Sequence, residues 1–152
     1  MKLRALLLLT FVLGACALAA PALAEEPPNP TDPKIASGSA EKALDKARAK
    51  WKKAKLGSYD FEAQRSCFCP TTGFHKVKIR KNRVSGTPHS DIKEIATVPR
   101  LFKVIQKAID EKSHKLTVTY GTYGVPTKIS IDRIANVIDE EQYFTIRRFK
   151  RR

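Results

Sequence analysis

The amino-acid sequence predicts an α+β fold, in which two amphipathic helices pack on one face of an antiparallel sheet of about six strands. Two segments carry apolar residues at helical spacing, and several short segments alternate apolar and polar residues. The connections between the alternating segments are too short for the crossovers that parallel strands need. A helix followed by three strands occurs twice along the chain, which suggests a duplicated αβββ unit.

Residues 1–24 have the features of a secretory signal peptide. Lys2 and Arg4 precede an uncharged, apolar segment that ends in the small-residue pattern Ala-Leu-Ala. We therefore expect cleavage after this pattern and export to the periplasm or the extracellular space. Residues 13–16 also resemble a bacterial lipobox, in which Cys16 would carry the lipid, so a lipid-anchored product is the alternative.

A change in composition separates this leader from the rest of the chain. Residues 25–38 contain four prolines and few apolar side chains, which predicts a disordered or extended linker. The remaining residues, 39–152, have the length of a single α+β domain with its own hydrophobic core. The full chain has a net charge of +14, which favours anionic partners over cationic ones.

The first half of the domain begins with a predicted amphipathic helix over residues 40–55, with Ser39 as its N-cap. Residues 58–64 and 75–81 alternate apolar and polar side chains, as half-buried strands do. A short strand over residues 83–86 is expected to follow the second of them.

The second half starts with an expected loop over residues 87–94. Thr97 then caps a second helix, with Pro99 in its first turn. An apolar stripe from Val98 to Ile109 makes this the strongest helix signal in the chain. Three further segments alternate and predict strands: residues 116–120, 129–131 and 143–149.

Cys67 and Cys69 are separated by one residue, and His75 follows closely. On a strand the two Cα atoms would lie about 6.6 Å apart, near the upper limit for a disulfide, so the backbone must bend. Four interpretations stay open: a local disulfide, a thiol redox site, a soft-metal site that includes His75, and two free thiols. Alternation along the hairpin places His75 opposite Cys69, and Cys67 opposite Val77.

Aromatic residues gather in a glycine-rich loop of the second half. Tyr120, Tyr123 and Pro126 form a candidate ligand rim, and a hairpin loop with aromatic packing is the alternative. No catalytic-triad order, phosphate loop or cofactor fingerprint is readable, so we assign no cofactor and no catalytic residue. The main expectation is a monomeric, non-enzymatic binding or cell-envelope-associated domain. A thiol redox or soft-metal-handling protein is the alternative.

Basic residues gather at two places. The candidate contacts for anionic envelope polymers or a lipid surface are Lys46, Lys50 and Lys53 in the first helix, and Arg148, Lys150, Arg151 and Arg152 at the C-terminal end. Alternation places Arg147 and Arg148 on opposite faces of the last strand. The tail beyond Phe149 is expected to fray. No nucleic-acid-binding motif is present, so nucleic acid is not an expected partner.

An ordered set of short motifs resembles a family of exported bacterial proteins known as domain-of-unknown-function family 6174. The set is Tyr59-x-Phe61, Cys67-Phe68-Cys69, Val98-x-x-Leu101-Phe102-x-x-Ile105-x-x-Ala108, Val118-x-Tyr120, Tyr123-Gly124-x-Pro126-Thr127-x-Ile129-x-Ile131-Asp132 and Asp139-x-Glu141-x-Tyr143. The resemblance runs from about Trp51 to Phe149. It implies a small secreted or lipid-anchored protein that folds as one unit, and it supplies no reaction.

Overall fold

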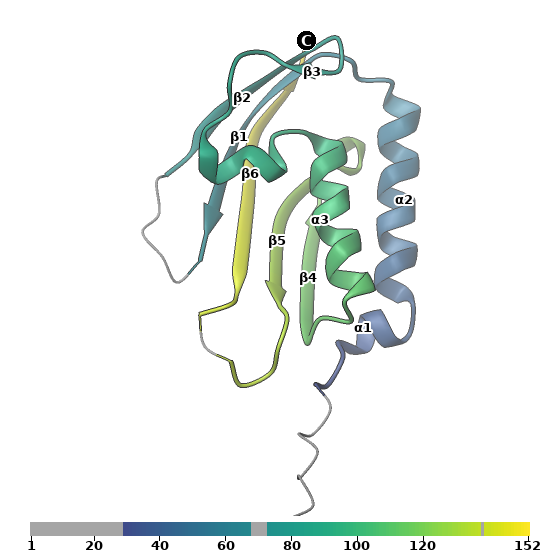
Figure 1. The fold of residues 1–152 in the computed structure, drawn as a ribbon. Helices are drawn as coiled ribbons and strands as arrows, with labels where there is room; N and C mark the ends of the chain where they lie inside the picture. Colours follow the sequence, from purple (N-terminus) through teal and green to yellow (C-terminus); the bar gives the residue numbers. More distant parts are fainter. Residues whose placement is uncertain (1–28, 68–72, 138) are drawn as a thin grey trace, which may run out of the picture.

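The computed structural model describes residues 29–67, 73–137 and 139–152, which form an α+β fold with a six-stranded antiparallel sheet (Figure 1). The elements are α1 (Pro33–Ala36), α2 (Ser39–Ala54), β1 (Tyr59–Ser66), β2 (His75–Arg80), β3 (Arg83–Val84), the 3₁₀ helix η1 (Ser90–Ile95), α3 (Val98–Asp110), β4 (Lys115–Tyr120), the 3₁₀ helix η2 (Thr122–Gly124), β5 (Pro126–Asp132) and β6 (Gln142–Arg151). The predicted fold class is confirmed. None of the helices in these described ranges combines the length and apolar character that crossing a bilayer needs.

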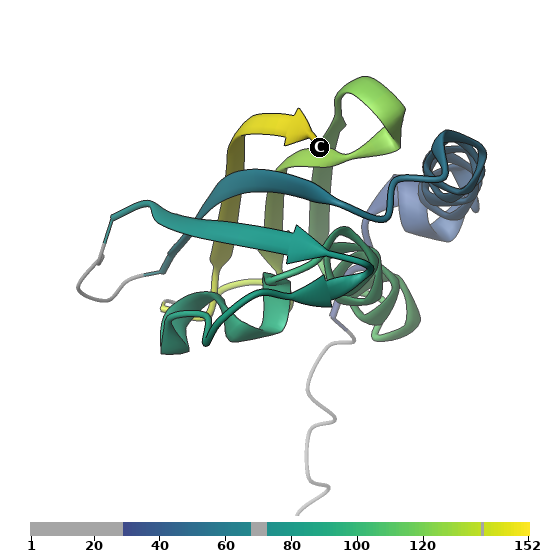
Figure 2. The same cartoon turned by 90° about the horizontal axis from the view of Figure 1, so that it is seen from above.

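The sheet has the strand order β3-β2-β1-β6-β5-β4. Each half of the domain is a helix followed by an antiparallel meander, so the element order α2-β1-β2-β3 recurs as α3-β4-β5-β6, as predicted. The first strand of one half pairs with the last strand of the other, because β1 is the antiparallel neighbour of β6. The helices α2 and α3 pack side by side (Figures 1 and 2).

The hydrophobic core lies between the sheet and these helices. Alternate residues of the strands point into it, including Phe61, Ile79 and Phe144, each of which is at most 2% exposed. At one end of the core Trp51 meets Tyr59 edge-on, with ring centroids 5.1 Å apart. Phe149 stacks on Tyr59 at 5.4 Å, so α2, β1 and β6 are joined by aromatic contacts.

The helix α3 begins as predicted, whereas α2 begins differently. The Thr97 hydroxyl oxygen accepts a hydrogen bond from the Arg100 backbone N–H at 3.2 Å, which confirms the predicted N-cap. In α2 the N-cap is Gly38 rather than Ser39. Because the chain turns there from α1 into α2 with a φ of 71°, the position favours glycine, and Ser39 becomes the first helical residue.

Residues 29–38 differ from the extended linker that their prolines predict. Asp32 caps α1 and is only 6% exposed. One of its carboxylate oxygens accepts a hydrogen bond from the Lys34 N–H at 2.6 Å, and the other accepts one from the Leu116 N–H of the edge strand β4 at 2.9 Å. The Asn29 side-chain amide donates a hydrogen bond to the Arg133 backbone carbonyl at 2.7 Å. This segment is therefore held against the sheet.

The loop expected over residues 87–94 also differs, because most of it forms η1. Ile92 and Ile95 are fully buried, and their three-residue spacing matches the period of a 3₁₀ helix. The His89 side chain caps this helix by accepting a hydrogen bond from the Asp91 N–H at 3.4 Å. The two isoleucines anchor η1 in the core, where it packs against β1.

Candidate functional site

The outer face of the sheet, which points away from α2 and α3, carries a pattern of alternating charge. On β1 the outward positions are Asp60 and Glu62. The register of β1 with β2 places Lys78 opposite Asp60 and Lys76 opposite Glu62. Each acidic residue of this central strand therefore has a basic cross-strand neighbour on the β2 side.

The neighbouring strand on the other side, β6, contains a β-bulge. The β1–β6 pairing shifts register between Asp60, which lies opposite Lys150, and Glu62, which lies opposite Arg147. Arg148 is the additional residue and has a φ of 53°, in the left-handed region. The bulge reverses the alternation, so Ile146 and Phe149 both point toward the core.

As a result, Arg147 and Arg148 lie on the same outer face and bind the same carboxylate. Arg147 Nε donates to Glu62 Oε2 at 2.8 Å, and an Arg148 terminal nitrogen donates to Glu62 Oε1 at 2.9 Å. These two guanidinium groups leave the Glu62 side chain only 9% exposed. The hydrogen bond from Arg147, together with that from Arg148, holds the pKa of Glu62 below its ordinary value, although desolvation opposes the shift.

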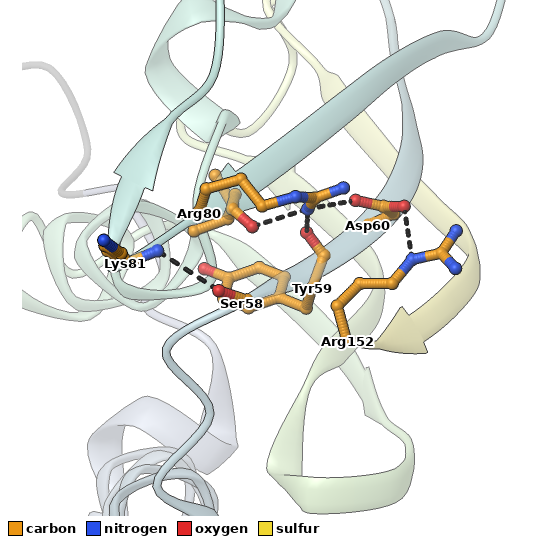
Figure 3. A network of polar contacts seen from close by, with 7 residues as sticks. Ser58, Tyr59, Asp60, Arg80, Lys81 and Arg152 are labelled. Atoms are coloured by element: carbon orange, nitrogen blue, oxygen red, sulfur yellow. Dashed lines mark hydrogen bonds and ion pairs between the residues drawn. The ribbon is translucent and has the colours of Figure 1, made fainter.

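Asp60 forms the second ion-pair centre of this face. Arg80 donates to Asp60 Oδ1 at 2.6 Å, and Arg152 Nε donates to Oδ2 at 2.8 Å, so β2 and the end of β6 reach it from either side (Figure 3). Arg80 also donates to the backbone carbonyl of Ile79 at 2.7 Å. The hydrogen bond from Arg80 is the main cause that lowers the pKa of Asp60.

We define the basic face as these two acidic residues and the seven basic residues around them: Asp60, Glu62, Lys76, Lys78, Arg80, Arg147, Arg148, Lys150 and Arg152. An open cleft of about 300 Å³ runs across it. Its charged lining comprises five basic and two acidic side chains, which gives a net formal charge of +3. Within the described parts of the chain, Lys76, Lys78 and Lys150 have no ion-pair partner. These ammonium groups are available to an external anion.

Two expectations about the C-terminal residues are wrong. Arg147 and Arg148 do not lie on opposite faces, because the bulge intervenes. The tail does not fray either, since β6 continues to Arg151 and the Arg152 N–H donates to the Ser58 carbonyl at 2.9 Å. Arg151 pairs with Tyr59, a core-facing position, and so does not belong to the basic face.

The basic residues of the first helix form a separate group. Lys46, Lys50 and Lys53 are exposed on α2. That helix lies beside α3 at the β4 edge of the sheet, and its Leu44 and Ala47 pack into the core (Figures 1 and 2). The two groups of predicted polyanion contacts are therefore not one continuous patch.

The cysteine pair falls at the edge of the described residues. Cys67 takes part in a disulfide, whereas Cys69 and Cys16 lie outside the described residues, so the pairing of Cys67 with Cys69 and the lipidation of Cys16 stay predictions. The expected register of His75 is wrong, because His75 lies opposite Ala63. The connection between β1 and β2 is longer than a tight turn, so the two strands pair in a different register from the one that alternation predicts.

The residues of the predicted ligand rim make packing contacts. Tyr120 lines a small cavity of about 160 Å³ beside α2, and burial raises its pKa to about 12. Tyr123 faces Phe149, with ring centroids 6.3 Å apart, and Pro126 is buried opposite Tyr120. Next to Tyr123, Gly124 lies so close to α2 that an added Cβ would be 2.2 Å from the Ala47 carbonyl oxygen. This loop docks α2 on the sheet.

Comparison with known proteins places the chain in one family. Residues 43–151 match a family of unknown function, DUF6174. No curated protein and no solved structure matches the chain significantly. The matched segment spans more than half of the chain and contains every residue of the basic face except Arg152. The chain belongs to the DUF6174 family.

Proposed function

We propose that this protein is a non-enzymatic binding domain whose basic face binds closely spaced phosphate groups of an anionic polymer or lipid surface. The observation that carries the proposal is the bulge at Arg148, which turns two consecutive arginines to one side of the sheet. Without the bulge, one of them would point toward the core side.

The arginines and the lysines of the basic face have different parts in this proposal. The arginines are fixed by Asp60 and Glu62, at hydrogen-bond distances of 2.6–2.9 Å. The lysines Lys76 and Lys78 lie two residues apart on one strand, about 7 Å at the usual strand rise. Lys150 lies two strands away, about 10 Å across the sheet. Such a spread of ammonium groups suits a ligand with several anionic groups.

The predicted signal peptide indicates in which compartment the protein would meet its ligand. An exported chain meets phosphate-bearing envelope polymers and anionic lipid headgroups, both of which present phosphate to a basic surface. The net charge is +14 for the full chain and +12 once Lys2 and Arg4 are removed with the signal peptide, and it adds long-range attraction to either ligand. The two sources share one chemistry and differ in whether a membrane is needed.

Binding to three probes at low and physiological salt tests the proposal. The probes are a short inorganic polyphosphate, vesicles that contain an anionic phospholipid, and zwitterionic vesicles. We expect binding to the polyphosphate or to the anionic vesicles that weakens strongly with salt, because exposed charges are screened. Binding to the polyphosphate indicates a polymer ligand, and binding to the anionic vesicles alone indicates a lipid surface. Equal binding to both kinds of vesicle, or binding to none of the probes, would contradict the proposal.

A further inference from the structure

A second cluster of polar side chains lies on the core side of the sheet edge, away from the basic face. Nitrogen atoms of His75 and His89 and a carboxylate oxygen of Asp91 all lie within 4.8 Å of one another. His75 begins β2, whereas the other two belong to the start of η1. Residues fourteen and more positions apart in the sequence thus meet through the packing of η1 on the hairpin.

The three side chains are held in place by contacts that need no ligand. The imidazole rings of His75 and His89 stack with centroids 3.9 Å apart and planes inclined by 11°. Asp91 Oδ2 lies 3.5 Å from His89 Nδ1, and the Ser90 hydroxyl donates to Asp91 Oδ1 at 3.1 Å. The buried Ile92 fixes η1 immediately after them. The cluster is therefore built on an anchored element.

We infer that His75, His89 and Asp91 form a binding site for a divalent cation of the Zn²⁺ class. Two imidazole nitrogens and one carboxylate oxygen are a donor set that Zn²⁺ accepts, with a fourth position open to water. Tetrahedral coordination brings donor atoms to about 3.4 Å from one another, at Zn–N distances near 2.1 Å. His89 is exposed and the other two are partly exposed, so rotation of the side chains can close the remaining gap.

This site does not use the cysteines that the sequence first pointed to. Cys67 takes part in a disulfide, and a disulfide sulfur is not the thiolate that binds zinc. The ring stacking also gives the site a spectroscopic signature. Nearly parallel imidazoles cannot both direct a nitrogen at one ion, so binding must turn at least one ring and change the ring-current shifts of both.

Proton NMR of the histidine rings during a Zn²⁺ titration tests the inference, in protein without a polyhistidine tag and with any free thiols blocked. The chain has only three histidines, so each ring signal can be assigned with single His→Gln variants. We expect the signals of His75 and His89 to move with one equivalent of Zn²⁺. The signal of His114, which contacts the Pro30 carbonyl elsewhere in the fold, should stay in place.

Variants give the quantitative part of the test. H75Q and H89Q should each weaken Zn²⁺ binding at least about tenfold, since even residues that only support a ligand cost that much. D91N should weaken it as well, and H114Q is the matched control that should not. Because His89 is exposed, H89Q is expected to fold normally even if H75Q does not. Zn²⁺ binding that survives in H89Q and D91N, that shifts His114 equally, or that disappears when thiols are blocked would overturn the inference.

Discussion

Arg147 and Arg148 are consecutive residues of β6, yet both side chains bind Glu62 on the same face of the sheet. A regular strand would send them to opposite faces. The bulge at Arg148 removes this constraint and returns Phe149 to the core, where it stacks on Tyr59. One additional residue thus doubles the guanidinium groups at Glu62 and keeps the aromatic core closed.

The bulge predicts a difference between two single-residue deletions. Deleting Arg148 restores regular alternation and leaves Phe149 facing the core, so the protein should fold with the environment of Trp51 unchanged. Deleting Phe149 places Lys150 at the core-facing position and should lower the free energy of unfolding by about 2 kcal/mol or more. Fluorescence of the single tryptophan and chemical denaturation report both effects. A larger loss from the Arg148 deletion would mean that the bulge itself stabilises the sheet.

The ion pairs predict how stability depends on pH. The folded-state pKa values of Asp60 and Glu62 lie below their ordinary values of 3.8 and 4.5. Their contribution is therefore complete above the ordinary values and is lost as the pH falls through the folded-state values. E62Q should flatten this acid-side loss in denaturation measured between about pH 2 and pH 7. E141Q, which removes a carboxylate with no ion pair among the described residues, is the control. An unchanged acid-side slope in E62Q would contradict the pairing.

Asp32 tests whether the segment before α2 belongs to the folded unit. Its carboxylate accepts two backbone N–H groups, so D32A should lower the free energy of unfolding by about 1–2 kcal/mol. D45A is the control, because Asp45 is exposed on α2 and should contribute within about 0.5 kcal/mol. Chemical denaturation of both variants decides the matter. Equal effects would show that residues 29–38 do not contribute to stability through Asp32.

Alanine variants of two glycines distinguish the stability cost of backbone strain from that of a steric clash. G124A and G86A both place a side chain at a positive φ, 77° and 83°, which costs roughly 1 kcal/mol. Only at Gly124 does the added Cβ meet another atom, the Ala47 carbonyl oxygen. G124A should therefore lose about 1–3 kcal/mol more than G86A in thermal or chemical unfolding. Similar losses would mean that α2 moves away from the loop at little cost.

Much of the fold follows from local patterns. The stripe in α3, the Thr97 cap and the alternation in β1 and β2 predict the elements that the structure contains, because periodicity records which side chains are buried. The structure of residues 29–38 is harder to predict, because their prolines suggest a linker. The Asp32-Pro33 pair is nevertheless an N-cap followed by a proline at the first helical position, and it marks α1.

The functional site was less predictable, for a physical reason. In the sequence two consecutive arginines separate Ile146 from Phe149 and break the alternation of β6, but the position of the bulge depends on the pairing with β1, which no local pattern records. The same applies to His75, His89 and Asp91. Their proximity depends on the register of a hairpin with a long connection and on the docking of η1. The basic composition indicated anionic partners, and only the sheet shows which lysines share a face.

Two triple variants with equal charge test the central claim, that the basic face binds phosphate groups. K76Q/K78Q/K150Q removes three basic side chains from the basic face, and K46Q/K50Q/K53Q removes three from α2. Both lower the net charge equally, so a difference between them locates the binding site and excludes general attraction.

The measurement is the affinity for a short inorganic polyphosphate, or for anionic vesicles if only these bind, at physiological salt. The account predicts that the basic-face variant loses at least about tenfold in affinity, with a reduced salt dependence, while the α2 variant changes by no more than about threefold. Equal losses in the two variants, or a larger loss in the α2 variant, would contradict it.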